Sequence, residues 1–337
     1  MMELAVLDQL RITEGRGARD ALKECVNLAA ECEALGYGRY WIAEHHRPGA
    51  MACVSPQILI TRIGAATRHM RIGAAGVLLD FYSPYKVAED FRTLETLYPG
   101  RIDLGVARGS GSGRPEAMAL LNGRNFKGSH SQRLLQLKEL VAPAAGRSGA
   151  IEPADSRQPQ FWVLGASEET AEFAGRMGLP FAAAHFLKGQ SAIKAAQAYR
   201  RVFQPSAALA EPRACLTVFA LASDDERDAN TLASSFLRCM VDETLSRSGP
   251  VPLPDAAAQL PVGNRADEAA ANWRERMIVG NTDKVQSALT ELAARAGADA
   301  LAMLTVAHDP AVRAESYRLI AGAFGLAPKP AAGVAAA

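Results

Sequence analysis

Short β-rich segments alternate with longer helical segments along most of the 337-residue chain, and this alternation restricts the folds that the chain can adopt. The β-rich segments are continuous apolar runs, which is typical of strands that are buried on both faces in a parallel sheet. About eight such strand–helix units favour a (β/α)8 TIM barrel over an open doubly wound sheet. The predicted strands cover residues 3–8, 39–43, 71–78, 102–107, 160–165, 180–184, 214–221 and 298–306. The predicted helices lie near residues 19–35, 54–68, 84–98, 131–141, 168–177, 189–203, 224–241, 282–295 and 310–324.

The segment 242–270 breaks this rhythm with Pro and Gly residues. We expect it to form an insertion or long loop before the last βα unit, and such segments often act as lids. Residues 1–326 are predicted to form a single TIM-barrel domain around it. The tail 327–337 has no hydrophobic pattern and is expected to be unstructured.

The charge balance excludes several classes of partner. The 37 basic and 36 acidic side chains leave a formal net charge of +1, which does not produce the basic field that binds nucleic acid or an anionic membrane. No apolar run approaches the roughly 18 residues of a membrane span, and the first residues are too polar for a signal peptide. The five cysteines have no CxxC spacing and predict reduced, mostly buried thiols. We therefore expect a cytoplasmic protein with neither a nucleic-acid nor a membrane partner.

Histidines gather where predicted strands end. In a TIM barrel the functional side chains belong at the carboxyl ends of the strands. Four of the six histidines follow predicted strands, namely His45, His46, His185 and His308. The first two come directly after Glu44, so an acid and two imidazoles are adjacent at one strand end.

This Glu-His-His sequence can be a metal site, an acid/base pair or a polar strand end without chemistry. The metal site is disfavoured because neighbouring side chains on an extended segment face opposite ways. The chain also has no HxH, HExxH or second acidic cluster at ligand spacing, so we expect no bound metal. The other two interpretations remain open, since polar groups at strand ends often only bond to nearby backbone.

Two further strand ends carry groups that suit an anion. Arg108 follows an apolar strand and precedes Gly109 and Ser110, which combines a two-pronged cation with backbone that an anion can approach. Ser167 and Thr170 lie at the start of a helix, where free amides, hydroxyls and the helix dipole favour a phosphate. Ser167 alone would be interpreted as a plain N-cap. Together with Arg108, the set favours a phosphate site.

Three segments resemble the bacterial luciferase-like flavin-dependent monooxygenases: EHHRPGA (44–50), IGAAGVLLDFYSPYKVAEDFRTLETLYPGRIDLGVARG (72–109) and VLGASEETAEFAGRMGLPFA (163–182). The resemblance is strong over residues 3–220 and looser over 275–325. It implies a TIM barrel that binds reduced FMN, takes up O2 and forms a flavin C4a-peroxide that oxygenates a substrate. A separate flavin reductase is then expected to supply the reduced FMN.

The resemblance also implies roles for particular residues in cofactor binding. Arg108, Ser167 and Thr170 match the groups that hold the flavin phosphate, and Ser110 lies where the backbone meets the flavin. Ala75-Gly76 falls where the family has a non-proline cis peptide under the isoalloxazine ring.

His45 matches the histidine associated with catalysis, and His46 and Glu44 stand beside it. Because histidine titrates near neutral pH, we expect His45 to exchange a proton during the reaction. Its alternative role is that of a hydrogen-bonding strut, and Glu44 is a candidate to orient one of the imidazoles.

The chain departs from the luciferases at two positions, which carry Ala107 in place of a reactive cysteine and Ala166 in place of an acid. Light emission is therefore not expected. Phe81, Tyr82 and Phe186 are predicted to shape the substrate pocket, which suggests an apolar or acyl-type substrate.

Two other functions remain open, namely hydride transfer with the deazaflavin F420 and flavin binding without catalysis. Both histidines and the arginine are retained, which argues against a non-catalytic protein. A homodimer is expected, with the helix predicted near residues 84–98 as a candidate contact.

Overall fold

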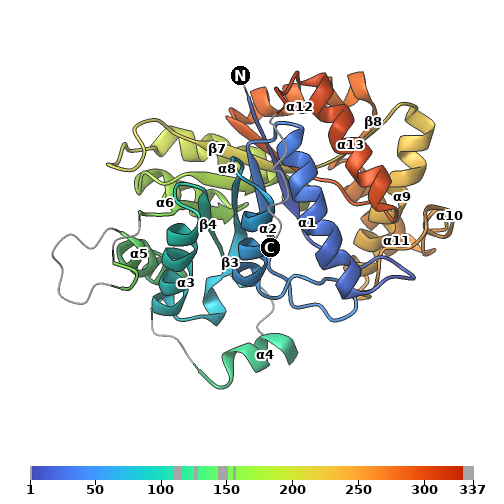
Figure 1. The fold of residues 1–337 in the computed structure, drawn as a ribbon. Coiled ribbons are helices and arrows are strands. Elements are labelled where there is room, and N and C mark those ends of the chain that lie inside the picture. The colour runs from blue at the N-terminus through green and yellow to red at the C-terminus, as the bar shows by residue number, and fades with distance from the viewer. Residues whose placement is uncertain (1, 110–114, 125–127, 143–150, 155–156, 329–337) are drawn as a thin grey trace.

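Nine parallel strands form one sheet in the part of the chain that the computed structural model describes, which is residues 2–109, 115–124, 128–142, 151–154 and 157–328. Eight of them close into a barrel in the order β1-β2-β3-β4-β5-β6-β7-β9, because β6 pairs with β7 and β9 pairs with both β7 and β1. Helices surround this barrel (Figure 1). The predicted TIM barrel is therefore confirmed.

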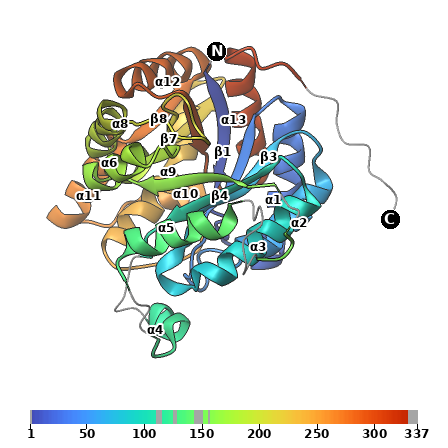
Figure 2. The same ribbon diagram turned by 90° about the vertical axis from the view of Figure 1, so that its left-hand side faces the viewer.

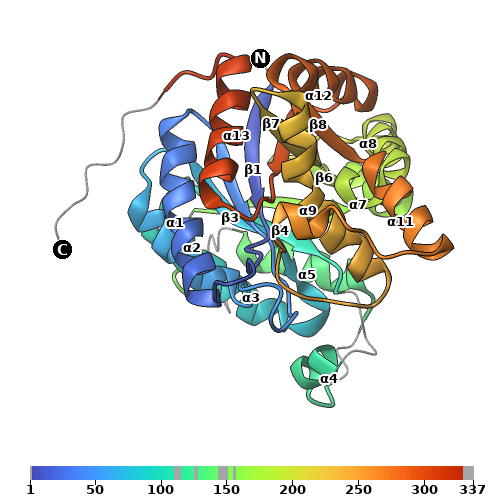
Figure 3. The same ribbon diagram turned by 90° about the vertical axis from the view of Figure 1, so that its right-hand side faces the viewer.

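The strands are β1 (Glu3–Asp8), β2 (Arg39–Ile42), β3 (Arg71–Leu78), β4 (Ile102–Ala107), β5 (Gln160–Gly165), β6 (Phe181–Ala184), β7 (Ala214–Ser223), β8 (Met277–Asn281) and β9 (Ala300–Leu304). The helices are α1 (Ala18–Ala34), α2 (Pro56–Ala66), α3 (Pro84–Leu97), α4 (Pro115–Leu121), α5 (His130–Val141), α6 (Glu168–Arg176), α7 (His185–Lys188), α8 (Gln190–Val202), α9 (Glu226–Thr244), α10 (Pro254–Ala257), α11 (Asn264–Arg274), α12 (Thr282–Ala296) and α13 (Pro310–Ala323), with a 3-10 turn at Leu79–Phe81. None of the described helices is long and apolar enough to cross a bilayer. Helix α4 projects away from the barrel (Figures 2 and 3).

Strand β8 was not predicted from the sequence. It is only five residues long and lies directly before α12, so its apolar run is too short to stand out. Strand β7 is twice as long, and its first half pairs with β9 while its second half pairs with β8. Strand β8 is thus an extra strand on the carboxyl-terminal half of β7 and is not one of the eight barrel strands.

The segment 242–270 is more helical than the expected long loop. It contains the end of α9, all of α10 and the beginning of α11. Helix α11 buries Ala266, Ala269 and Ala270 against Leu237 and Val241 of α9. These small side chains let the two helices pack closely. In the sequence, the surrounding Pro and Gly residues obscure this helical pattern. Figure 3 shows α9 and α11 together on one side of the barrel.

A buried ionic network closes the amino-terminal end of the barrel. Asp103 is fully buried and accepts hydrogen bonds from Arg39 Nη1 at 2.5 Å, Trp41 Nε1 at 2.8 Å and Arg71 Nε at 2.8 Å. Arg39 also binds Glu3 through its Nε at 2.7 Å. Because these charged side chains stand at or near the starts of their strands, they fill the bottom of the barrel and leave the carboxyl ends for a cavity.

All five cysteines, each of which the structure describes, are buried and unpaired. Burial raises the pKa of their thiols, that of Cys215 to about 12 and that of Cys239 to about 11. The predicted burial of these thiols is therefore confirmed.

The substitution Asp103→Asn tests the importance of this network for stability. It keeps the shape of the side chain but removes the buried charge that Arg39 and Arg71 share, which leaves Arg39 with Glu3 alone and Arg71 with no carboxylate in the described part of the chain. We therefore expect a loss of about 3 kcal/mol or more in the free energy of unfolding. The matched control is Glu172→Gln, which removes an exposed i,i+4 pair with Arg176 and should cost less than about 0.5 kcal/mol. Urea unfolding of both variants measures the difference. Equal losses of stability would contradict a stabilising role for the Asp103 network.

Candidate functional site

A cavity of about 1100 Å³ opens at the carboxyl ends of the barrel strands. Most of the predicted site residues line it, namely Glu44, His45, Ala75, Gly76, Arg108, Ser167, Thr170 and Phe186. Among the described residues, His46, Phe81 and Tyr82 are not part of its wall. Ser110 lies outside the described residues.

Ser167 and Thr170 form a hydroxyl pair at the start of α6. Ser167 is the N-cap, and its Oγ accepts a hydrogen bond from the Thr170 backbone N–H at 3.2 Å. The two hydroxyl oxygens lie 3.0 Å apart. Gly165 makes room for this pair, since a Cβ at that position would lie 2.8 Å from Thr170 Cγ2. Ser167 therefore caps the helix and also presents its hydroxyl to the cavity.

Arg108 reaches the same cavity from the neighbouring strand. It follows β4, which pairs directly with β5, the strand that leads to Ser167. Its side chain is exposed. Lys188 and Lys194, which the sequence did not single out, also line this cavity. The arrangement offers an anion three cations, two hydroxyls and a helix N-terminus.

The peptide bond between Ala75 and Gly76 is cis, as the resemblance implied. It lies where the register of β3 against β4 shifts between Ala74 and Val77. A side chain at position 76 would come within 2.9 Å of the Gly105 carbonyl oxygen. Glycine therefore allows β3 to approach β4 closely here while its backbone faces the cavity.

Glu44 orients His46, not His45. Its Oε1 lies 2.8 Å from His46 Nε2 and accepts a hydrogen bond of 2.5 Å from the Tyr82 hydroxyl, while Oε2 accepts from the Leu78 backbone N–H at 3.0 Å. Burial and the adjacent Glu44 carboxylate raise the pKa of the Tyr82 phenol well above its usual value. Tyr82 thus lies behind the cavity wall and helps to hold the Glu44 carboxylate in place.

His45 lines the cavity, and Glu44 does not orient it. Its Nδ1 is buried and has no hydrogen-bond partner in the described part of the chain. Burial, together with the charges of Arg11 and Arg47, lowers the pKa of His45 to about 4. The expected pKa near neutrality is therefore wrong, and at pH 7 the side chain is a neutral imidazole.

Sequence reasoning missed several residues of the wall. His130 lines the cavity and bonds to Asp80 through its Nδ1 at 2.7 Å, although it begins a helix and follows no strand. Arg11, Arg47 and Glu243 also line the cavity, and the sequence gives no local signal for their association. Conversely, His185 and His308 follow strands but do not line the cavity.

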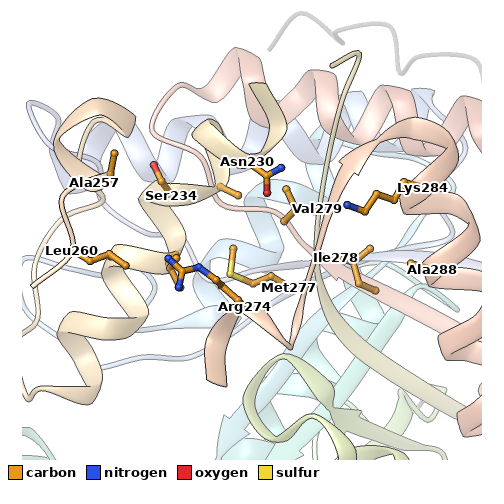
Figure 4. A pocket seen from close by; sticks show the side chains of 13 residues that line it. Asn230, Ser234, Ala257, Leu260, Arg274, Met277, Ile278, Val279, Lys284 and Ala288 are labelled. Atoms are coloured by element: carbon orange, nitrogen blue, oxygen red, sulfur yellow. The ribbon is translucent and has the colours of Figure 1, made fainter. Parts of the chain in front are cut away.

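A smaller cavity of about 490 Å³ lies outside the barrel, between α9, α10, β8 and α12. Asn230, Ser234, Arg274 and Lys284 provide its polar groups (Figure 4). Lys284 is held by an ion pair with Glu226 of α9. None of the predicted site residues that the structure describes lies in its wall, so the barrel cavity is the candidate active site.

Comparisons with known proteins show the family of this chain. Residues 2–142 match the luciferase-like monooxygenase family. The luciferase-like monooxygenase of Escherichia coli K12 is 32% identical over 94% of this chain and 95% of its own length. The N-acetyl-S-alkylcysteine monooxygenase of Bacillus subtilis is 34% identical over 72% of this chain and 75% of its own. The crystal structure of apo-MsnO8 covers 98% of this chain and 100% of its own, with 36% identity and a TM-score of 0.91.

This chain belongs to the luciferase-like monooxygenase family and is an oxidoreductase. More distant solved structures include a diketocamphane monooxygenase in complex with FMN, at 18% identity and a TM-score of 0.71. They also include an F420-dependent alcohol dehydrogenase, at 16% identity and a TM-score of 0.64. At these identities the likeness extends to the fold alone.

The pH dependence of stability tests the burial of neutral histidines. His185 is buried with its Nδ1 unpartnered, and burial with the charges of Arg295 and Arg276 lowers its pKa from 6.5 to about 4. As the pH falls from about 6.5 to 4, the unfolded chain binds a proton that the folded chain does not, so stability is lost in this window. At pH 5.0 the loss from His185 should be about 2 kcal/mol relative to pH 7.5.

The comparison is between the wild type and His185→Gln, each unfolded in urea at pH 7.5 and pH 5.0. The variant should lose about 2 kcal/mol less on acidification, because glutamine does not titrate. Equal losses in the two proteins would show that His185 does not resist protonation.

Proposed function

We propose that this protein is a flavin-dependent monooxygenase that uses reduced FMN and O2 to oxygenate a small organic substrate. The observation that carries the proposal is the convergence of Arg108, Ser167 and Thr170 on the cavity that also contains His45 and the Ala75-Gly76 peptide. These groups come from β2, β3, β4 and β5, which are consecutive neighbours in the sheet, so the strand order brings them together.

The residues present fit the phosphate of FMN. The exposed guanidinium of Arg108 is a charged two-pronged donor, and the Ser167 and Thr170 hydroxyls lie 3.0 Å apart at a helix N-terminus. Lys194 and Lys188 add positive charge in the same cavity. Reduced FMN, when bound, supplies the electrons and the reaction with O2, while the chain positions it and excludes water.

His45 is the group that we assign to proton control. As a neutral imidazole it offers an acceptor and an N–H donor, and its Nδ1 is left free by the rest of the chain. The ring is half-buried and lines the cavity, where it can contact a bound ligand. Gly76 leaves the adjacent backbone open to a planar ring.

The substrate has to fit a wall that mixes apolar and polar groups. Leu164, Phe186, Met240 and Trp273 supply the apolar part, which suits a substrate with an alkyl or aromatic portion. The N-acetyl-S-alkylcysteine monooxygenase among the relatives makes S-substituted N-acetylcysteines reasonable first test substrates. Oxygen-18 from O2 should then appear in the product.

Two alternatives use the same cavity. Hydride transfer with F420 would also employ a phosphate site, and direct titration with FMN and with F420 separates the two cofactors. A non-catalytic flavin-binding protein would bind FMN but would not couple its oxidation to oxygenation of any substrate. The position of His45 in the cavity wall favours a catalytic protein.

A pair of substitutions separates cofactor binding from chemistry. Arg108→Met removes a charge-assisted contact of about 1.5–3 kcal/mol and should weaken FMN binding roughly ten- to hundredfold. His45→Ala should leave FMN affinity nearly intact and lower the turnover at least tenfold, since it removes only the proton carrier. FMN fluorescence titration and product formation with ¹⁸O2 measure the two effects.

The control is Arg318→Met, which removes an exposed arginine that pairs with Glu315 on α13 and should change neither quantity. FMN affinity that survives Arg108→Met would remove the phosphate assignment. Unchanged turnover in His45→Ala would remove His45 from the chemistry.

We also propose that a separate reductase supplies reduced FMN in the cytoplasm, where the five free thiols would stay reduced.

We further propose a homodimer that forms through α2 and α3. Ile58 on α2 and Tyr85 and Leu97 on α3 are exposed apolar side chains on neighbouring helices. Sedimentation at micromolar concentration should give a dimer, and Ile58→Glu should give a monomer. Val262→Glu changes an exposed valine outside these helices and should leave the dimer intact. A monomeric wild type would contradict the proposal.

A further inference from the structure

Two arginines share one carboxylate on the side of the cavity next to α9. Arg11 Nη1 lies 2.9 Å from Glu243 Oε1, and Arg47 Nη1 lies 2.5 Å from Glu243 Oε2. Arg11 follows β1, Arg47 lies in the loop after β2, and Glu243 is near the end of α9. All three line the cavity. Arg11, Arg47 and Glu243 are called the arginine cluster below.

The arginine cluster carries a net positive charge. Burial alone would raise the pKa of Glu243, but the two guanidiniums outweigh burial and lower it, so this carboxyl is ionised at neutral pH. His45, which lies close enough to sense both arginines, is neutral. Within the arginine cluster, two positive charges therefore face one negative charge. The Glu44 carboxylate of the same cavity already bonds to His46, Tyr82 and the Leu78 backbone N–H.

The two arginines differ in how well their donors are satisfied. The Arg11 side chain is 4% exposed, and it also bonds to Gln9 Oε1 through its Nε at 3.0 Å. The Arg47 side chain is 25% exposed, and Glu243 is its side-chain partner in the described part of the chain. Arg47 thus retains N–H donors that a ligand in the cavity can use.

The arginine cluster stands across the cavity mouth from the phosphate site. Around the barrel, β5 is four strands from β1 in either direction, so Ser167 after β5 and Arg11 after β1 lie on opposite sides. One phosphate cannot bind both groups. The excess charge beside α9 therefore remains available when FMN occupies Arg108, Ser167 and Thr170.

We propose that the substrate carries an acidic group, a carboxylate, that binds Arg47 at the arginine cluster. A planar carboxylate matches the fork of a guanidinium and can accept two parallel hydrogen bonds. It would also neutralise the excess positive charge of the arginine cluster. The apolar part of the substrate then extends toward His45. This inference rests on the proposed function only for the reaction that follows binding.

The experiment compares acids with their amides, which differ in charge but hardly in shape. The probes are octanoate, 4-phenylbutyrate and benzylthioacetate, each with the corresponding carboxamide, titrated by calorimetry at pH 7.5. Wild type should bind at least one acid about tenfold or more tightly than its amide. Arg47→Met should reduce that preference to within about twofold, and Arg47→Lys should retain part of it, since the charge remains.

Glu243→Gln separates recognition of an acid from a structural role. Like Arg47→Met, it removes the ion pair that connects the loop after β2 to α9, but it increases the positive charge of the arginine cluster. Acid binding should therefore be retained or tightened in Glu243→Gln. If acid binding depends only on the structure that this ion pair maintains, both variants lose the acid preference. Circular dichroism establishes that each variant is folded.

The outcomes distinguish this inference from the proposed function, because each titration is performed with and without FMN. An acid preference that depends on Arg47, in a protein that does not bind FMN, would support the acid site and contradict the flavin proposal. FMN binding without any acid preference, or with a preference that survives Arg47→Met, would overturn the acid site alone.

Discussion

The pairing of β9 with both β1 and β7 is the constraint on which the remaining structure depends. It closes eight parallel strands into a ring, so that all their carboxyl ends face one cavity. The buried Asp103 network occupies the opposite end and prevents the interior from being a pore. Residues far apart in the chain, such as Arg11 after β1 and Glu243 on α9 after β7, line the same cavity because of this closure.

The fold and the candidate phosphate site could be predicted because their signals are local. Continuous apolar runs mark parallel strands, and a serine followed by two acidic residues marks a helix start. Arg108 directly follows such a run, so its place at a strand end does not depend on distant contacts. The cis peptide at Ala75-Gly76 has no local signal of this kind and was expected only from the family resemblance.

The remaining features depend on long-range contacts that no local pattern contains. Arg11 and Glu243 are 232 positions apart, and neither belongs to a motif, so the arginine cluster is visible only in three dimensions. The lowered pKa of His45 follows from burial and from those same arginines. Strand β8 is too short to be recognised, and it exists because β7 extends beyond the barrel and offers a free edge.

The most direct test is a crystal structure of this protein with bound FMN. The account predicts that the phosphate lies within hydrogen-bond distance, about 2.7–3.2 Å, of the Arg108 guanidinium and of the Ser167 and Thr170 hydroxyls, with the arginine cluster left free. A phosphate bound to Arg47 and Arg11, or an FMN molecule outside the barrel cavity, would contradict it.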